Sequence, residues 1–170
     1  MDERASQSIE SLKSLRAVRQ FRPDRVPDEV VHDILEVARW SGSASNRQAA
    51  EIVVVHSPEM LKRLAGLHGY IGHLAGAALG MILVMPGEWP EGDAFDEGRL
   101  AERIMLAAAA HGVGSSIGWF VQSGRDDAKR ILGVPANKLV RTAISLGYPA
   151  GPARRGARKP LSQVVHEEKY

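Results

Sequence analysis

The sequence lacks cysteine altogether, has few aromatic residues (5%) and contains no long apolar run. The absence of cysteine excludes disulfides, thiolate catalysis and cysteine-ligated zinc or iron–sulfur sites. No run reaches the ~18 apolar residues of a membrane-spanning helix. The chain opens with Met1-Asp2-Glu3-Arg4 rather than with an apolar signal segment. We therefore expect a cytoplasmic protein without a membrane partner.

The composition is that of an ordinary globular chain. Of its 170 residues, 44% are hydrophobic and 25% are charged, and the formal net charge is only +2. That apolar fraction is enough to form a core, which excludes wholesale disorder. No repeat, low-complexity tract or internal linker interrupts the chain. We expect one domain over residues 1–170.

The near-neutral total conceals three segments of opposite charge. Residues 13–25 carry five cations and one acid, residues 152–160 carry four cations and no acid, and residues 86–98 carry five acids and no cation. The two basic segments could converge on one anion, and a phosphate monoester suits guanidinium groups. Solvated surface is the alternative. Nucleic acid is disfavoured, because no aromatic residues lie among the cations and the acidic stretch would repel a polyanion.

Hydrophobic periodicity predicts a mixture of helices and strands. Two helices precede the first strand, which argues against a regular βαβ repeat and favours an α+β fold with about four strands. The acidic stretch at residues 86–98 is expected to be a loop. We expect helices over 6–17, 27–38, 57–65, 99–111 and 126–132, and strands over 52–55, 81–85, 116–121 and 139–146.

Several common site motifs are missing or incomplete. Gly112 to Gly118 nearly matches a dinucleotide-binding fingerprint, but the last glycine is one place late and the glycines follow a helix instead of a strand. The six histidines show no metal-binding spacing. No Gly-x-Ser-x-Gly elbow is present, which disfavours a serine hydrolase. We therefore expect no metal site and name no catalytic residue.

Asn46 and Gln48 lie two residues apart in a polar loop that precedes a buried strand. Each side chain offers both a donor and an acceptor. Such an amide pair suits a flat heterocycle with alternating carbonyl and N–H groups, such as an isoalloxazine ring. Capping of the loop itself is the alternative.

Six segments, in this order and spacing, resemble the FMN-dependent nitroreductase family over nearly the whole chain. Residues 14–21 (SLRAVRQF) are similar to the family's R-R-S-V-R-x-F, and residues 42–48 (GSASNRQ) to its P-S-x-x-N-x-Q loop. The others are residues 26–40, residues 96–118 with the D-x-G and glycine-rich pattern, residues 145–149 (SLGYP) and residues 158–166 (RKPLSQVVH).

The resemblance implies a central mixed sheet of four to five strands flanked by helices, with a C-terminal tail that crosses to the partner subunit. It implies a homodimer with FMN at the interface, and Ser43 reaching the flavin from the partner. Hydride would pass from NADH or NADPH through flavin N5 to nitroaromatic, quinone or similar acceptors by a ping-pong mechanism. The implied cofactor-binding residues are Arg16, Ala17, Arg19, Ser43, Asn46, Gln48, Ile117, Gly118, Trp119, Arg155 and Arg158.

The sequence departs from the family pattern at several of these positions. Leu15 replaces an arginine and Ala17 a serine, Gly42 replaces a proline, and Ala49-Ala50 replaces the usual Pro-Trp. The resemblance with these departures implies an open, poorly specific site or a weakened affinity for FMN. Two alternatives follow: a relative that uses FMN for another oxidation, dehalogenation or flavin fragmentation, and a protein that binds or sequesters flavin without turnover.

Overall fold

The computed structural model describes residues 2–154 and 156–170, and its centre is a four-stranded sheet in the order β1-β2-β4-β3. The strands are β1 (Glu51–Val55), β2 (Leu79–Met85), β3 (Gly114–Trp119) and β4 (Leu139–Gly147). All three strand pairings are antiparallel, which confirms the α+β class and corrects the expected mixed sheet. The one parallel contact among the described residues is an isolated bridge between Ala17 and Ser115.

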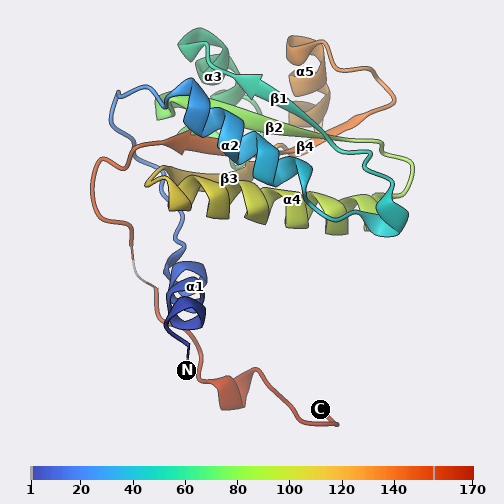
Figure 1. The fold of residues 1–170 in the computed structure, drawn as a ribbon. Coiled ribbons are helices and arrows are strands. Elements are labelled where there is room, and N and C mark those ends of the chain that lie inside the picture. The colour runs from blue at the N-terminus through green and yellow to red at the C-terminus, as the bar shows by residue number, and fades with distance from the viewer. Residues whose placement is uncertain (1, 155) are drawn as a thin grey trace.

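Helices cover both faces of this sheet (Figure 1). One face packs against α2 (Asp28–Arg39) and α4 (Pro90–Ala110), and the other against α3 (Pro58–Ala65), α5 (Ser123–Leu132) and the short 3-10 helix η2 (Gly72–Gly76). Because side chains alternate along a strand, β2 sends Met81 and Leu83 into the first core and Ile82 and Val84 into the second. Burial on both faces explains why the apolar run at 81–85 has no polar alternation.

The acidic stretch is helical from Pro90 onward, and three of its five acids are buried, which corrects the expected loop. Helix α4 begins at Pro90, a residue favoured in a first helical turn, and continues to Ala110. The side chains of Asp93, Asp96 and Glu97 are all buried within the body of the protein. Glu97 is paired with Arg141, whose Nε lies 2.9 Å from Oε2. These three acids therefore make internal contacts, whereas Glu88 and Glu91 remain exposed.

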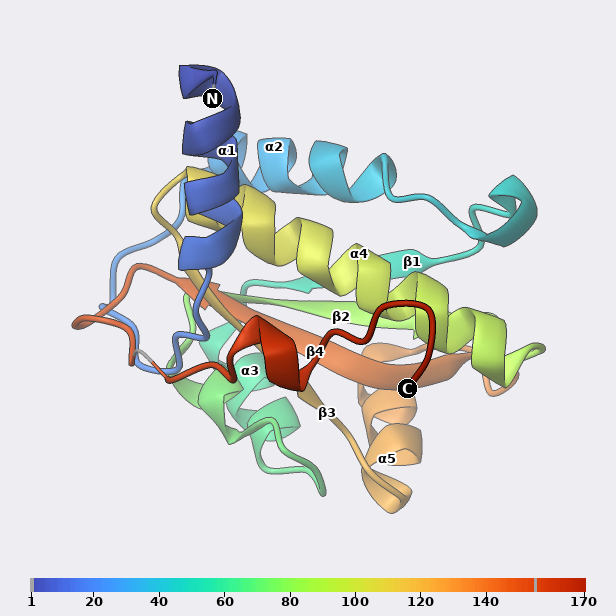
Figure 2. The same ribbon diagram turned by 90° about the horizontal axis from the view of Figure 1, so that it is seen from below.

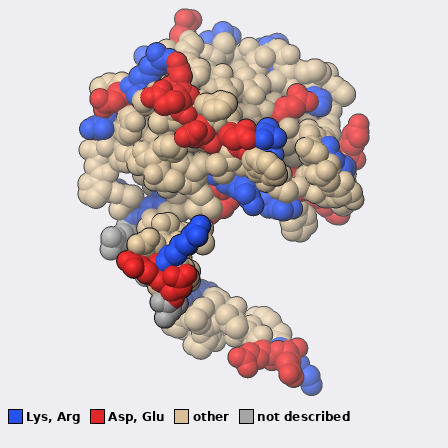
Figure 3. All heavy atoms as spheres, viewed as in Figure 1, with Lys and Arg blue, Asp and Glu red and all other residues tan. Residues whose placement is uncertain are grey.

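Two segments stand apart from the body formed by the sheet and the helices on its two faces. Helix α1 (Glu3–Ser14) has no buried residue, and the described residues of the tail from 156 onward, including the 3-10 helix η3 (Leu161–Gln163), are all exposed. Figure 1 shows both segments below the body, Figure 2 views them from their own side, and Figure 3 shows them projecting from the body. No helix of the described residues is long and apolar enough to cross a membrane.

The projecting segments leave the chain with more surface than its mass requires. The accessible surface is 10820 Å² for 18.4 kDa, whereas a compact monomer of this mass exposes only about 8,200 Å². Part of the excess is apolar, because Leu12, Leu161, Val164 and Val165 are each more than half exposed. These side chains would contribute to the stability of the protein only if another surface covered them.

Candidate functional site

The outer edge of β3 contains a gap between two backbone contacts. At one end, Val18 N–H donates to the Ser115 carbonyl at 2.8 Å, and at the other, Tyr70 N–H donates to the Trp119 carbonyl at 2.8 Å. Antiparallel strands turn alternate residues toward the same neighbour, so the amide of Ile117 also points outward, between these contacts. No described residue accepts from this N–H. An unpaired strand amide is a ready donor for a ligand.

Gly118 allows the segment of residues 70–73 to lie close beside β3 at this gap. A Cβ atom at this position would collide with the Tyr70 carbonyl and would lie 2.6 Å from His73 Nε2. The exposed rings of Tyr70 and Trp119 are in contact at the same end of the strand, with centroids 5.3 Å apart. Glycine is therefore required by close backbone approach, and the gap has an aromatic border.

Arginines lie next to the other end of the gap. Arg16, Ala17 and Arg158 line one hollow of about 510 Å³. Ala17 and Arg19 line a neighbouring hollow of about 400 Å³ together with Arg154. None of these four arginines forms an ion pair with a carboxylate in residues 2–154 or 156–170. The two basic segments of the sequence thus converge, and their charges are available to an anion.

Individual contacts distinguish these arginines. Arg16 donates to the carbonyls of Lys13 and Leu15, both at 2.7 Å, and its Nε is buried without a partner in the described part of the chain. Arg158 is exposed, and within the described part of the chain its side chain donates hydrogen bonds only to the carbonyls of Gly156 and Ala157. Arg155, the remaining predicted arginine, lies outside the described residues.

His73 borders the same gap and was missed from the sequence, because its glycine-rich surroundings have no clear periodicity. Its Nδ1 lies 2.7 Å from the Ser145 hydroxyl, which donates to the Ser116 carbonyl at 3.4 Å. In the tautomer that carries its proton on Nδ1, the hydroxyl accepts from Nδ1–H and Nε2 is an acceptor. This Nε2 is buried and has no hydrogen-bond partner among the described residues. Burial lowers the pKa of His73, and the nearby charge of Arg19 lowers it further.

This environment predicts a specific pH dependence of stability. Because the folded-state pKa of His73 is lowered from its ordinary value of 6.5, protonation favours the unfolded chain. The stabilising contribution is present above pH 6.5 and is lost as the pH falls through the folded-state pKa. The His73→Gln variant should show a shallower loss of unfolding free energy below pH 6.5, measured by urea titration. An unchanged pH profile would contradict the environment assigned to His73.

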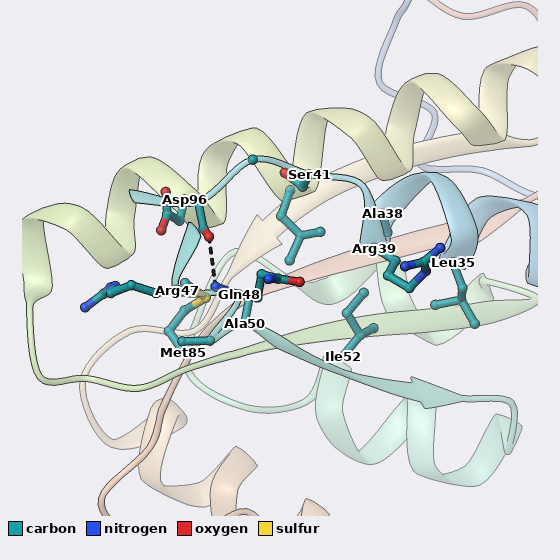
Figure 4. Close-up of a pocket in the computed structure, with 14 residues that line it drawn as sticks. Leu35, Ala38, Arg39, Ser41, Arg47, Gln48, Ala50, Ile52, Met85 and Asp96 are labelled. Atoms are coloured by element: carbon teal, nitrogen blue, oxygen red, sulfur yellow. Dashed lines mark hydrogen bonds between the residues drawn. The ribbon is translucent and has the colours of Figure 1, made fainter. Parts of the chain in front are cut away.

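The amide loop lies elsewhere in the chain. Ser43 and Gln48 line a separate hollow of about 290 Å³ between α2, β1 and α4 (Figure 4). Asn46 is exposed in the 3-10 helix η1 (Ala44–Asn46). Figures 1 and 2 place η1 beside the N-terminal end of α4, whereas residues 15–18 lie near its C-terminal end. Within one chain, the structure does not bring the predicted amide and arginine groups together.

The predicted site therefore divides into two parts. The first, which we call the β3-edge site, consists of the arginine hollows and the adjacent strand edge, with Arg16, Ala17, Arg19, Ile117, Gly118, Trp119 and Arg158. The second is the amide loop, residues 43–48. Among the described residues, no group of three or more histidine, aspartate or glutamate side chains is placed to hold a metal ion.

Comparisons with known proteins agree with the resemblance. A model of the nitroreductase family matches residues 12–68. The nitroreductase NfnB of Mycolicibacterium smegmatis is 29% identical over 212 residues, covering 94% of this chain and 90% of that protein. An FMN-dependent nitroreductase from Clostridium difficile superposes with a TM-score of 0.83 at 24% identity, covering 95% of this chain and 99% of the other.

A third protein matches along most of the chain. The NADPH:FMN oxidoreductase of Vibrio harveyi, whose structure was solved in complex with NAD+, superposes with a TM-score of 0.81 at 25% identity. The alignment covers 96% of this chain and 77% of that structure. Together, these matches confirm the predicted resemblance to the nitroreductase family.

Proposed function

We propose that this chain, which resembles the nitroreductase family in sequence and in fold, is an NAD(P)H-dependent FMN oxidoreductase. The observation that carries the proposal is the β3-edge site, where an unpartnered backbone amide lies beside arginines that have no acidic partner. A flavin mononucleotide combines a polar heterocyclic edge with a terminal phosphate, so it requires both groups. The orphaned Arg16 Nε and His73 Nε2 are further polar atoms that a bound ligand could satisfy.

The chain's own residues supply binding and orientation. Arg16, Arg19 and Arg158 would hold the phosphate or the ribityl chain through charge-assisted hydrogen bonds. The Ile117 amide would donate to the heterocycle, and Trp119 would border it. The chemistry that FMN supplies when bound is acceptance of hydride from NADH or NADPH and its later donation to a nitroaromatic, quinone or similar acceptor, in ping-pong order.

We further propose that two chains complete each site. The amide loop is too far along α4 to reach the β3-edge site of its own chain, but a two-fold partner could present its loop there. The exposed apolar side chains of α1 and the tail would then be covered, with the tail crossing to the partner. This arrangement would account for the excess surface of the isolated chain.

The departures from the family pattern affect the proposed affinity. Leu15 packs partly buried against the core. Its aliphatic side chain has no N–H group that could donate to a phosphate as an arginine would. Ala17 contributes its backbone to the bridge with Ser115 and has no hydroxyl. The remaining arginines would therefore carry the phosphate interaction, and FMN binding should be correspondingly sensitive to each of them.

The test is reduction of the bound flavin. Purified protein saturated with FMN should lose its flavin absorbance when NADH or NADPH is added under argon, and an acceptor such as a quinone should restore it. Binding of FMN without reduction by either nicotinamide would contradict the reductase proposal and favour a flavin-sequestering protein. Failure to bind FMN at all would contradict both.

A further inference from the structure

The amide loop is held by buried carboxylates of helix α4. Both oxygens of Asp96 accept from the Ala44 N–H at 3.1 Å. Asp93 accepts from Arg47 through Oδ1 and from the Gly87 N–H through Oδ2, both at 2.9 Å. Asp93 and Asp96 are 0% and 7% exposed. These two acids connect the loop to a rigid helix that is 46 or more residues away in sequence.

The loop needs such support because its backbone is strained. Ser45, Asn46 and Gln48 all have positive φ, at 50°, 54° and 50°. Asparagine tolerates this region, but for serine and glutamine it costs free energy that surrounding contacts must offset. The helix η1 has no buried residue, so apolar packing within the chain does not supply these contacts. Inside the loop, the Ser43 hydroxyl accepts from the Gln48 N–H at 2.8 Å.

The strained conformation determines where the amide side chains point. Gln48 lies beside Arg47 and Asp96 at one end of the hollow in Figure 4. Asn46 and Gln48 are exposed, and the only hydrogen bond that either side chain makes in the described part of the chain is a long one of 3.5 Å, from Gln48 Nε2 to the Asn46 carbonyl. Their polar groups are therefore held ready for a ligand rather than used within the fold.

We infer that Asp93 and Asp96 are positioning residues, which hold the loop in its strained form so that Asn46 and Gln48 are oriented before a ligand binds. The inference rests on the proposed function in one respect, since it takes the ligand to be FMN. Preorganisation of this kind increases affinity because the ordering cost is not incurred on binding.

The first test needs no flavin. In the wild-type protein, the Ala44 amide should exchange its hydrogen slowly although it lies in a surface loop, because a buried carboxylate accepts from it. Asp96→Ala should accelerate exchange over residues 43–48 at least tenfold, and Asp96→Asn, which keeps one acceptor oxygen, should have a smaller effect. Glu91→Ala, an exposed acid on the same helix, is the matched control. Fast exchange of Ala44 in the wild-type protein would overturn the inference.

The second test measures the effect on FMN. Asp96→Ala should raise the FMN dissociation constant about tenfold or more, the scale of a lost hydrogen bond to a charged group. Adding Ser45→Gly should recover at least about threefold of this loss, because glycine adopts positive φ without strain. A merely structural role for Asp96 would show no such rescue.

The positioning role of Asp96 and the proposed FMN-dependent function can each be contradicted without the other. If Asn46→Ala weakens FMN binding but Asp96→Ala does not, the loop contacts the flavin and the positioning role is wrong. If neither the wild-type protein nor any variant binds FMN, the proposed function fails, and the exchange measurement alone decides whether Asp96 orders the loop. If Asp96→Ala does not fold, Asp96→Asn provides the same comparison with a retained acceptor.

Discussion

Replacing Arg19 with alanine is expected to weaken FMN binding about tenfold to a hundredfold, the range for a hydrogen bond to a charged group. Arg19 has no acidic partner among the described residues, so its positive charge is not already neutralised within the chain. It also lies close enough to His73 to lower the pKa of that imidazole. Titration of the apoprotein with FMN, followed by quenching of flavin fluorescence, would measure the change.

Arg22 provides the matched control for this substitution. It lies three residues further along the chain, pairs with Asp24 at 3.2 Å and stacks over Tyr148. Arg22→Ala should leave FMN affinity unchanged within about twofold, a difference below the net value of a typical hydrogen bond. Arg158→Ala should act in the same direction as Arg19→Ala. If Arg19→Ala binds FMN as tightly as the wild-type protein, Arg19 does not contact the phosphate or the ribityl chain.

Removal of residues 159–170 is expected to dissociate the proposed dimer and abolish FMN binding. Leu161, Val164 and Val165 are 76%, 55% and 54% exposed, and covering side chains of this size contributes ~1.5–3 kcal/mol each. Six such side chains in a dimer should change its dissociation constant by more than about a thousandfold. Sedimentation equilibrium would detect the change as a loss of the species with twice the 18.4 kDa chain mass.

The truncated chain should still fold, which separates loss of assembly from loss of structure. All of the removed residues are exposed and none belongs to either hydrophobic core. Its melting temperature at low protein concentration should therefore match that of the full chain diluted to the monomer. A truncated protein that remains dimeric and binds FMN normally would show that the tail does not complete the site.

The sequence predicts the helices and strands well where the pattern is local. The run at 81–85 is apolar on both faces because two cores enclose β2, and the glycines after α4 mark a true helix end, with Gly112 at a φ of 69°. The sequence predicts a helix start at Arg99, whereas α4 begins nine residues earlier, at Pro90. The first turns of α4 carry buried acids with no local partner in the sequence, because Asp93 and Glu97 pair with Arg47 and Arg141, which are far away along the chain.

The sequence predicts only part of the candidate site, because the rest depends on contacts between residues that are far apart along the chain. Arginine segments can be identified from composition, and the structure places arginines of both segments along two hollows. The outward direction of the Ile117 amide depends on how β3 pairs with β4, and the position of His73 depends on the contact of residues 69–73 with the same strand. Such long-range pairings leave no local periodicity in the sequence. The division between the arginines and the amide loop also became evident only in three dimensions.

The most direct test of a site shared between two chains is complementation between two defective variants. Arg19→Ala impairs the β3-edge site, and Asn46→Ala impairs the amide loop. If each FMN site takes one part from each chain, a mixed dimer contains one intact site and one doubly impaired site. Equal amounts of the two variants, unfolded together and refolded, should then recover tight FMN binding at about one quarter of all sites, as random pairing of two chains requires. Recovery of no tight sites, with mixed dimers demonstrably formed, would contradict the shared site.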